Sequence, residues 1–456
     1  MPSWLLYTLG VVIFAFGLLL SIALHEVGHM VPAKKFGVKV TQYMVGFGPT
    51  MWSRKRGDTE YGLKAVPLGG YIRMIGMVPP RADGRRSRWP RRMATAVEDF
   101  RQVSRAEVQP GDEERQFYRL TPGKKMIVMV GGPTMNLLIY LVLTIIVLTT
   151  LGVAKERPPT LTITSIEKCV VAANRTDVDP NECPVGSEAP AYRKLQPGDT
   201  VLAVDGTPVT SWDGLVSRVE TSAGAPLRMT IRRDGITRTV TVTPVRNLKR
   251  VVDGKGGTKL ATTGYLGVSP VIPRYYDTLS LTEIPGEIGR QLHLGVSALA
   301  RYPEKIGNLF GTVFQGEKRD PEGAVGVVGI GRISGDLAES KAITTKDKVA
   351  SLLGLLASVN LLLFFFNLLP LLPLDGGHVA GAIVEAVKRG RARLRARSQP
   401  PLVGPDGGAV RPARPQIFVD TAQMLPVMYG VASVLVVLTL LTLYADIVSP
   451  IRLLGG

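Results

Sequence analysis

Four long runs of apolar residues interrupt an otherwise mixed chain. They cover residues 4–24, 126–153, 349–374 and 424–444. Each is close to or above the roughly 20 apolar residues that a helix needs to cross a bilayer. The first run has no basic segment before it and no small-residue cleavage site after it, which favours a span over a signal peptide. The pattern predicts a polytopic α-helical membrane protein with about four transmembrane helices.

Between the second and third runs the pattern changes to short strands. Residues 161–166, 200–204, 227–232 and 236–242 are strand-like, and Asp234-Gly235 between the last two is a hairpin turn signal. These runs predict a small β-rich domain. An amphipathic stretch follows it at about residues 284–314.

The distribution of charge orients the predicted spans. The net charge is +18, from 55 Lys and Arg against 37 Asp and Glu. Residues 76–125 hold 12 basic residues and residues 388–420 hold 8, whereas residues 155–341 are nearly balanced with 24 basic and 21 acidic. The positive-inside rule places the two basic segments in the cytoplasm, and the long middle segment and both termini outside. Charge clustered beside apolar runs favours a membrane surface rather than nucleic acid as the partner.

Proline and glycine pairs lie within or beside the two basic segments. Pro79-Pro80, Pro400-Pro401 and Gly407-Gly408 break regular elements. We therefore expect solvated loops there, with contact to anionic lipid as the alternative.

Cys169 and Cys183 are the only cysteines, and both lie in the segment assigned outside. A disulfide can persist in that compartment, so the two cysteines are a possible pair. Two free thiols are the alternative.

The first apolar run leads into His25-Glu26-Val27-Gly28-His29. Residues four apart share one face of a helix, so both imidazoles can bind one Zn²⁺. Glu26 lies beside them and can take a proton from a water on the metal. The chain has only four histidines, so a chance match of this spacing is a poor explanation. Polar groups in a membrane segment are costly and are usually functional.

A catalytic zinc needs a third protein ligand, and Asp375 is the best candidate. The first and third spans run in the same direction, so His25 and Asp375 both come at inner ends and can meet in one leaflet. Asn136 follows Gly132-Pro133 near the inner end of the second span, so this segment can approach too. Asp446 lies at the outer end of the fourth span, which favours an interfacial residue.

The chain resembles the site-2 proteases, which are zinc intramembrane metalloproteases, and within them the bacterial PDZ-containing envelope-stress branch of actinobacterial type. The resemblance covers most of the chain. It rests on His25 to His29, Gly132-Pro133 with Asn136, the motif from Asn367 to Gly377, and an inserted PDZ-like segment.

The PDZ-like segment covers about residues 160–245. Pro197-Gly198-Asp199 followed by Val204-Asp205-Gly206 is similar to bacterial protease PDZ domains. Residues 169–193 differ from the short glycine-rich peptide-binding loop of that family. Peptide capture by strand addition is therefore left open beside a role as a size filter.

The resemblance implies a role for each matching residue. His25, His29 and Asp375 would bind one Zn²⁺, and Glu26 would be the general base. Pro370 and Pro373 would interrupt the helix, and Gly376 and Gly377 would allow close approach to the metal. The residues that it implies in substrate binding are Asn367, Gly46, Gly48, Gly69, Gly70 and Asn136.

Residues 38–74 match a β-hairpin that re-enters the membrane from the cytoplasm in this family. A sheet edge inside a membrane is tolerable where it lines a cavity, which suits a substrate helix that unwinds and pairs as a strand. A structural plug against the first span is the alternative.

The predicted domains follow this organisation along the chain. They are the first transmembrane helix with the zinc motif (1–35), the re-entrant hairpin (36–77), a basic cytoplasmic loop (78–125), the second helix (126–153), the extracytoplasmic PDZ-like domain (154–250), a linker with an amphipathic helix (251–345), the third helix with the Asp motif (346–388), a second basic loop (389–420), and the fourth helix with the C-terminus (421–456).

The function that the resemblance implies is cleavage of a transmembrane helix in regulated intramembrane proteolysis and envelope-stress signalling. The substrates would be single-span proteins such as anti-sigma factors, trimmed first by another protease, in the plasma membrane. A zinc transporter would need a further His or acidic cluster in the spans, which the sequence lacks. A non-catalytic scaffold would not need Glu26.

Overall fold

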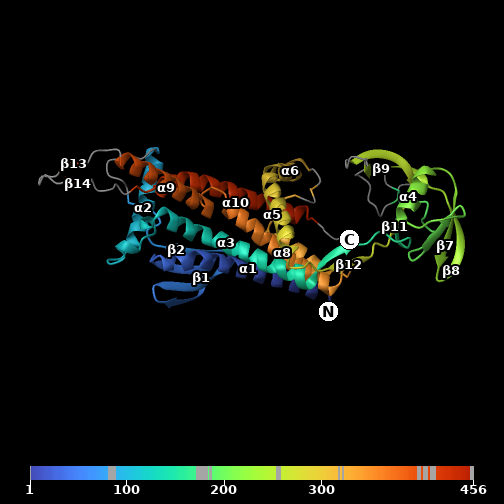
Figure 1. Ribbon diagram of the computed structural model, residues 1–456, viewed down its shortest axis with the longest axis horizontal. Coiled ribbons are helices and arrows are strands. Elements are labelled where there is room, and N and C mark those ends of the chain that lie inside the picture. Colours follow the sequence, from blue (N-terminus) through green and yellow to red (C-terminus); the bar gives the residue numbers. More distant parts are fainter. Residues whose placement is uncertain are drawn as a thin grey trace. The chain divides into compact units, whose positions relative to one another are not determined.

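The structure is a computed structural model with two compact units. One unit is Met1–Gly152 with Thr278–Gly456, and the other is Val153–Asp277 (Figure 1). The described residues are 2–80, 89–170, 183, 187–252, 258–316, 319–320, 323–341, 343–397, 402–403, 409–410 and 417–451. Parts of both predicted basic loops, including residues 81–88 and 411–416, therefore lie outside the described residues.

Four described helices of the first unit are long and apolar enough to cross a membrane. They are α1 (Ser3–Lys35), α3 (Pro122–Ile146, extended by a π-helical turn at Val147–Leu151), α8 (Thr345–Asn367) and α10 (Leu425–Val448, preceded by a 3-10 turn at Thr421–Met424). They match the four apolar runs, except that α8 ends at Asn367, short of residue 374. The prediction of four apolar helices of spanning length is therefore confirmed. α3 contacts both α1 and α8 (Figure 1).

The first unit has further helices that the apolar runs do not contain. They are α2 (Arg91–Ala106), α5 (Ile284–Ala300), α6 (Tyr302–Gln315), α7 (Val327–Glu339) and α9 (Asp375–Arg397), with 3-10 turns at Glu113–Arg115 and Phe117–Arg119. α5 and α6 occupy the predicted amphipathic stretch. α7 was not predicted, because its glycine-rich sequence does not favour a helix. Packing against α1 supports the helix, and Gly335 lies against the ring of Tyr7 there.

The expectation of loops is wrong for α2 and for the last part of α9, which are helical. The end of α9 is mostly exposed as expected, whereas α2 has a buried side. Arg101 of α2 is only 2% exposed. It donates to the carbonyl of Pro79 at 2.6 Å and to both carboxylate oxygens of Asp420 at 3.0 and 3.1 Å. The partner that buries Arg101 comes from a segment 319 residues away, so local breakers could not reveal this contact.

A long bent hairpin follows α1 and lies along it (Figure 1). Its strands are β1 (Val40–Arg56) and β2 (Thr59–Met74). Residues 42–45 of β1 pair with residues 60–63 and also with residues 70–73, so the hairpin folds back on itself as four short strands. Strand 70–73 is one outer edge and strand 52–56 is the other. The turn at Gly57-Asp58 therefore returns to the beginning of β1.

The second unit is built around a four-stranded sheet in the order β6-β5-β7-β8. Buried Val201, Met229, Ile231 and Leu215 form the centre of its core. Its elements are β3 (Val153–Glu156), β4 (Ile163–Ile166), β5 (Thr200–Val204), β6 (Thr207–Pro208), α4 (Trp212–Thr221), β7 (Leu227–Arg233), β8 (Ile236–Val242), β9 (Val245–Val252), β10 (Thr258–Tyr265), β11 (Val268–Pro270) and β12 (Arg274–Asp277). A separate short pair in the first unit joins β13 (Leu402–Val403) and β14 (Ala409–Val410).

The four predicted strand runs of this unit are confirmed as β4, β5, β7 and β8. Asp234 and Gly235 both have positive φ, at 48° and 80°, which is the backbone that a tight two-residue hairpin turn requires. The compact unit extends beyond residue 250, to Asp277, because β10 pairs with β9 and β11 pairs back to β4. Cys169 and Cys183 form a disulfide.

Asp199, directly before β5, is fully buried and is paired with Arg233. Two hydrogen bonds of 2.7 Å join the guanidinium to the carboxylate, which also accepts the amide of Gln196 at 2.8 Å. Burial raises the pKa of Asp199, but these hydrogen bonds outweigh burial and hold the pKa below its ordinary value. The contribution of the carboxylate to stability is therefore complete above pH about 4 and is lost as pH falls through the lowered pKa.

Replacing Asp199 by asparagine should destabilise the second unit by about 3 kcal/mol, because Arg233 is left without its counter-charge. Hydrogen exchange of β5 and β7 in the full chain at neutral pH measures this loss. Asp213→Asn is the matched control, because Asp213 is exposed. Equal protection in the two variants would contradict a stabilising role for the pair.

Candidate metal centre

His25, Glu26 and His29 lie in the C-terminal third of α1. The helix places His25 and His29 one turn apart, with their Nε2 atoms 3.2 Å from each other. His29 is 5% exposed and Glu26 is 9% exposed. The predicted helix and its shared face are therefore present, and the polar cluster is shielded from bulk solvent.

Asp375 reaches the same point from the other end of the chain. α8 ends at Asn367 and α9 begins at Asp375, with Pro370 and Pro373 in the interruption between them, as predicted. Asp375 Oδ2 lies 3.3 Å from His25 Nε2 and 3.3 Å from His29 Nε2. Among the described residues, these three form the group of His, Cys, Asp or Glu side chains that could hold a metal ion.

The three ligand atoms fit zinc. A tetrahedral zinc with ligands about 2.0–2.1 Å away requires ligand atoms about 3.3–3.4 Å from one another. The observed triangle has sides of 3.2, 3.3 and 3.3 Å. Two imidazole nitrogens and one carboxylate oxygen leave a fourth position for water or substrate, which is the arrangement of a catalytic site.

The backbone of α3 orients one of the two imidazoles. His29 Nδ1 lies 2.8 Å from the carbonyl oxygen of Val128. A proton on Nδ1 donates to this carbonyl, which leaves the Nε2 lone pair directed at the metal position. His25 Nδ1 is buried and has no hydrogen-bond partner among the described residues.

Glycines of α1 and α3 allow the helices to meet beside the site. A Cβ on Gly28 would lie 2.3 Å from the carbonyl oxygen of Gly131, so the two backbones touch. A Cβ on Gly132 would lie 2.1 Å from His29 Nε2 and 2.7 Å from His25 Nε2. Gly132 therefore forms a wall of the metal position. The sequence predicted only that this segment of the second span comes near the site.

Glu26 lies between the metal ligands and the outer edge of the hairpin. Its carboxylate is within hydrogen-bonding reach of the Ile72 backbone. A Cβ on Gly70 would lie 3.0 Å from Glu26 Cγ, so the strand packs directly on this side chain. Of the glycines predicted to bind substrate, Gly70 is therefore the one placed against the catalytic motif.

The other predicted substrate-binding residues lie in the hairpin, in α3 and at the end of α8. Gly46, Gly48 and Gly69 have positive φ, at 93°, 84° and 114°, near the bend of the hairpin. Asn136 is 1% exposed in α3, and its Oδ1 has no hydrogen-bond partner among the described residues. Asn367 is the half-buried last residue of α8. Their role in substrate binding stays a prediction.

Gly376 and Gly377 pack closely on the loop before α9, since added Cβ atoms would meet Leu369 O at 2.2 Å and Leu372 N at 2.6 Å. Their close approach to the metal stays a prediction. Asp446 lies near the end of α10, and protein covers it to 1% exposure. It accepts from Arg319 at 2.6 Å and from the amide of Gly329 at 2.7 Å, both from a segment distant in sequence.

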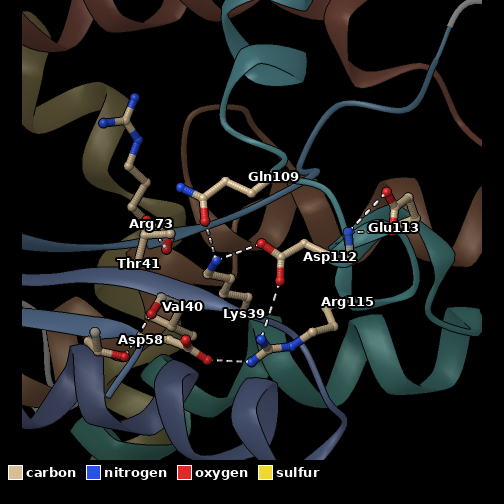
Figure 2. Close-up of polar contacts among 11 residues, drawn as sticks. Lys39, Val40, Thr41, Asp58, Arg73, Gln109, Asp112, Glu113 and Arg115 are labelled. Carbon is tan, nitrogen blue, oxygen red and sulfur yellow. Dashed lines mark hydrogen bonds and ion pairs between the residues drawn. The ribbon is translucent and has the colours of Figure 1, made fainter. Parts of the chain in front are cut away.

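An ion-pair cluster holds the base of the hairpin to the segment before α3. Figure 2 shows Lys39 between Gln109 and Asp112, with Nζ 2.6 Å from the Asp112 carboxylate. The guanidinium of Arg115 donates to the Asp112 carboxylate at 3.3 Å and to the Asp58 carboxylate at 2.6 Å, and so joins the two. Since Asp58 is in the hairpin turn and Lys39 precedes β1, the cluster fixes both ends of the folded-back strands. No spacing in the sequence predicted it.

Replacing Asp112 by alanine should loosen the hairpin without emptying the metal site. Removing a buried carboxylate from Lys39 and Arg115 costs about 1–3 kcal/mol. We expect hydrogen exchange in residues 40–74 to rise about tenfold or more while zinc content is unchanged. Glu113→Gln is the control, because within the described part of the chain the Glu113 carboxylate accepts from the nearby amide of Gly111. Unchanged exchange in the Asp112 variant would show that the cluster does not restrain the hairpin.

The fold and site together define a membrane-embedded metallohydrolase. A helix long enough to span a membrane carries His25, Glu26 and His29. Asp375, which begins the helix after a break, supplies the third ligand atom opposite the two histidines.

Comparison with known proteins agrees with this class. The model of peptidase family M50 matches residues 13–399. The zinc metalloprotease Rip1 of Mycobacterium tuberculosis is 35% identical over 98% of this chain and 100% of its own length. Rip1 of Mycolicibacterium smegmatis is 32% identical over the same shares, and RasP of Geobacillus kaustophilus is 26% identical over 80% of this chain and 86% of its own.

The chain belongs to peptidase family M50, the site-2 protease family. It is a metalloprotease that hydrolyses peptide bonds, and zinc is its cofactor.

Proposed function

We propose that this protein is an intramembrane endopeptidase that cleaves the transmembrane helix of single-span proteins already trimmed outside the membrane, such as anti-sigma factors. The observation that carries the proposal is the triangle of His25, His29 and Asp375 with Glu26 beside it. The histidines and Glu26 lie within α1, and Asp375 follows α8 after the interruption that contains Pro370 and Pro373. Both helices are apolar and of spanning length, which supports a reaction directed at peptide bonds at membrane depth.

His25, His29 and Asp375 would hold the zinc. When bound, zinc supplies a Lewis acid that polarises the scissile carbonyl and lowers the pKa of water. Glu26 accepts the proton of the attacking water and returns it to the leaving amine, which converts a poor leaving group into a neutral one. Val128 orients His29 through its carbonyl, and the contact of Gly28 with Gly131 keeps α1 and α3 in place.

The bent hairpin is proposed to enter the membrane and to pair with the unwound substrate. Its bend is apolar and exposed, with Phe47, Met51, Trp52 and Val66 between 43% and 69% exposed. Its turn is charged and is anchored at Asp58 and Arg115. This polarity suits a bend in lipid and a turn at the surface. Strand 70–73 lies beside Glu26 as an outer edge, so it offers backbone groups to an extended peptide.

We propose that Gly46, Gly48, Gly69 and Gly70 shape this edge and that Asn136 and Asn367 bind the substrate backbone near the site. The buried Oδ1 of Asn136, which lacks a hydrogen-bond partner among the described residues, supports a polar ligand there.

The proposed location is the plasma membrane, with the second unit outside and the metal site toward the cytoplasm. Basic residues at 76–125 and 388–420 support this orientation. The disulfide between Cys169 and Cys183 also suits an oxidising side. The second unit is proposed to be PDZ-like, with α4 beside a small antiparallel sheet, and to exclude substrates that retain a large outer domain.

The test is cleavage of a tagged single-span anti-sigma factor by the full chain in liposomes, with the outer substrate domain present or removed. We expect cleavage of the trimmed substrate only, and within its transmembrane helix. Equal cleavage of both forms would exclude the size filter. No cleavage of either form by zinc-loaded protein would contradict this substrate class.

A further inference from the structure

α2 has an apolar face that is exposed in the structure. Met93, Phe100 and Val103 are 46%, 40% and 58% exposed. At about 100° per residue, these positions fall within about 80° of one another around the helix axis. Gln102 lies on the opposite side and is exposed too. α2 is therefore amphipathic, and its apolar stripe runs along most of the helix on one side.

Three contacts hold α2 level with the beginning of α10 (Figure 1). Val97 packs against Ala422 and Leu425. Arg101 pairs with Asp420, as described above, and the indole of Trp89 donates to the carbonyl of Gln423 at 2.8 Å.

The apolar segment of spanning length that contains α10 begins at Thr421. α2 therefore lies at the depth where this span meets the membrane surface. A tryptophan at this depth is typical of a membrane interface.

The charge around α2 is complementary to a lipid surface. Arg91, Arg92 and Arg105 are exposed on the helix. A helix with an apolar stripe and arginines on its polar side lies in the plane of a membrane, with its apolar face at the boundary of headgroups and acyl chains. Juxtamembrane arginines add attraction to anionic lipid.

We propose that α2 is an interfacial membrane-binding helix that inserts Met93, Phe100 and Val103 into the cytoplasmic leaflet and directs its arginines at anionic lipid phosphates. The bilayer is favoured over a second protein for two reasons. Val97, one turn from Met93, packs on the beginning of the α10 span. The exposed arginines of α2 are complementary to lipid phosphates. The proposal depends on α10 spanning the membrane and does not depend on protease activity.

The test uses the full-length protein in lipid nanodiscs with one environment-sensitive fluorophore. Both native cysteines are in the disulfide, so an introduced cysteine supplies the sole reduced thiol. Phe100→Cys and Val103→Cys report the apolar stripe, and Gln102→Cys is the matched control on the same helix. All three positions are exposed, so labelling leaves the buried contacts of Val97 and Arg101 intact. Quenching by lipids spin-labelled near the headgroup is measured for each label.

We expect blue-shifted emission and several-fold stronger lipid quenching at positions 100 and 103 than at position 102. Equal quenching at all three positions would overturn the proposal. Blue-shifted emission at 100 and 103 without lipid quenching would also overturn it, since protein would then cover the stripe.

The measurement is repeated in phosphatidylcholine alone and in equal parts of phosphatidylcholine and phosphatidylglycerol. Stronger quenching at position 100 with phosphatidylglycerol is expected from the arginines. Quenching that is independent of phosphatidylglycerol would overturn the role of anionic lipid.

Discussion

Glu26→Gln should lower cleavage by about three orders of magnitude while the protein still holds one zinc per chain. Loss of a positioned general base costs about 10²–10⁴ in rate, since glutamine cannot accept the proton of the attacking water. Glutamine has nearly the same size as glutamate, and Glu26 does not belong to the group of His25, His29 and Asp375 that could hold the metal. Zinc content by elemental analysis and cleavage of the trimmed substrate in liposomes measure the two quantities separately.

Glu304→Gln is the matched control, because Glu304 is an exposed carboxylate on α6. It should leave both zinc content and cleavage unchanged. If Glu26→Gln cleaved as well as the parent chain, another base or a contaminating protease would have to account for the activity.

Gly132→Ala should remove zinc and abolish cleavage together. Glycine to alanine inside a helix ordinarily stabilises it by roughly 0.5–1 kcal/mol. At this position the new methyl group would lie 2.1 Å from His29 Nε2, well inside van der Waals contact. The clash is with the ligand nitrogen itself. One outcome is that an imidazole leaves the triangle of ligand atoms, and the other is that α3 moves away from α1. Zinc retained after dialysis against a chelator measures the outcome.

Gly123→Ala provides the control on the same helix. A Cβ at Gly123 meets nothing within 4 Å, so this variant should bind zinc like the parent chain. Normal zinc affinity in Gly132→Ala would mean that the contact between α1 and α3 yields easily and that Gly132 does not limit the metal position.

The candidate metal site was predictable because two of its residues are local in the sequence. His25 and His29 are one helical turn apart. Asp375 is distant, but it follows an apolar run as His25 does, and the positive-inside rule predicts the same direction for both runs. The positions of the four spans are predictable from local sequence too, because about 20 consecutive apolar residues usually form a helix that crosses a membrane.

The parts that were not predicted depend on contacts between distant segments. Arg101 and Arg319 look like ordinary surface charges, but Asp420 and Asp446 pair with them across 319 and 127 residues. α7 contains three glycines in 13 residues, a composition that favours a loop, and its packing on α1, α8 and α10 stabilises the helix. No periodicity in a single sequence carries such information.

The entry and exit of the second unit lie side by side. β3, where the chain enters, pairs antiparallel with β12, where it leaves. Immediately outside the unit, the amide of Leu279 donates to the carbonyl of Leu148 at 3.1 Å. The whole unit is thus inserted into the parent chain at a single point, between two residues that would be near neighbours without it. Such a domain can be gained, lost or exchanged during evolution by one splice, which leaves the helices that hold the metal in their original connection.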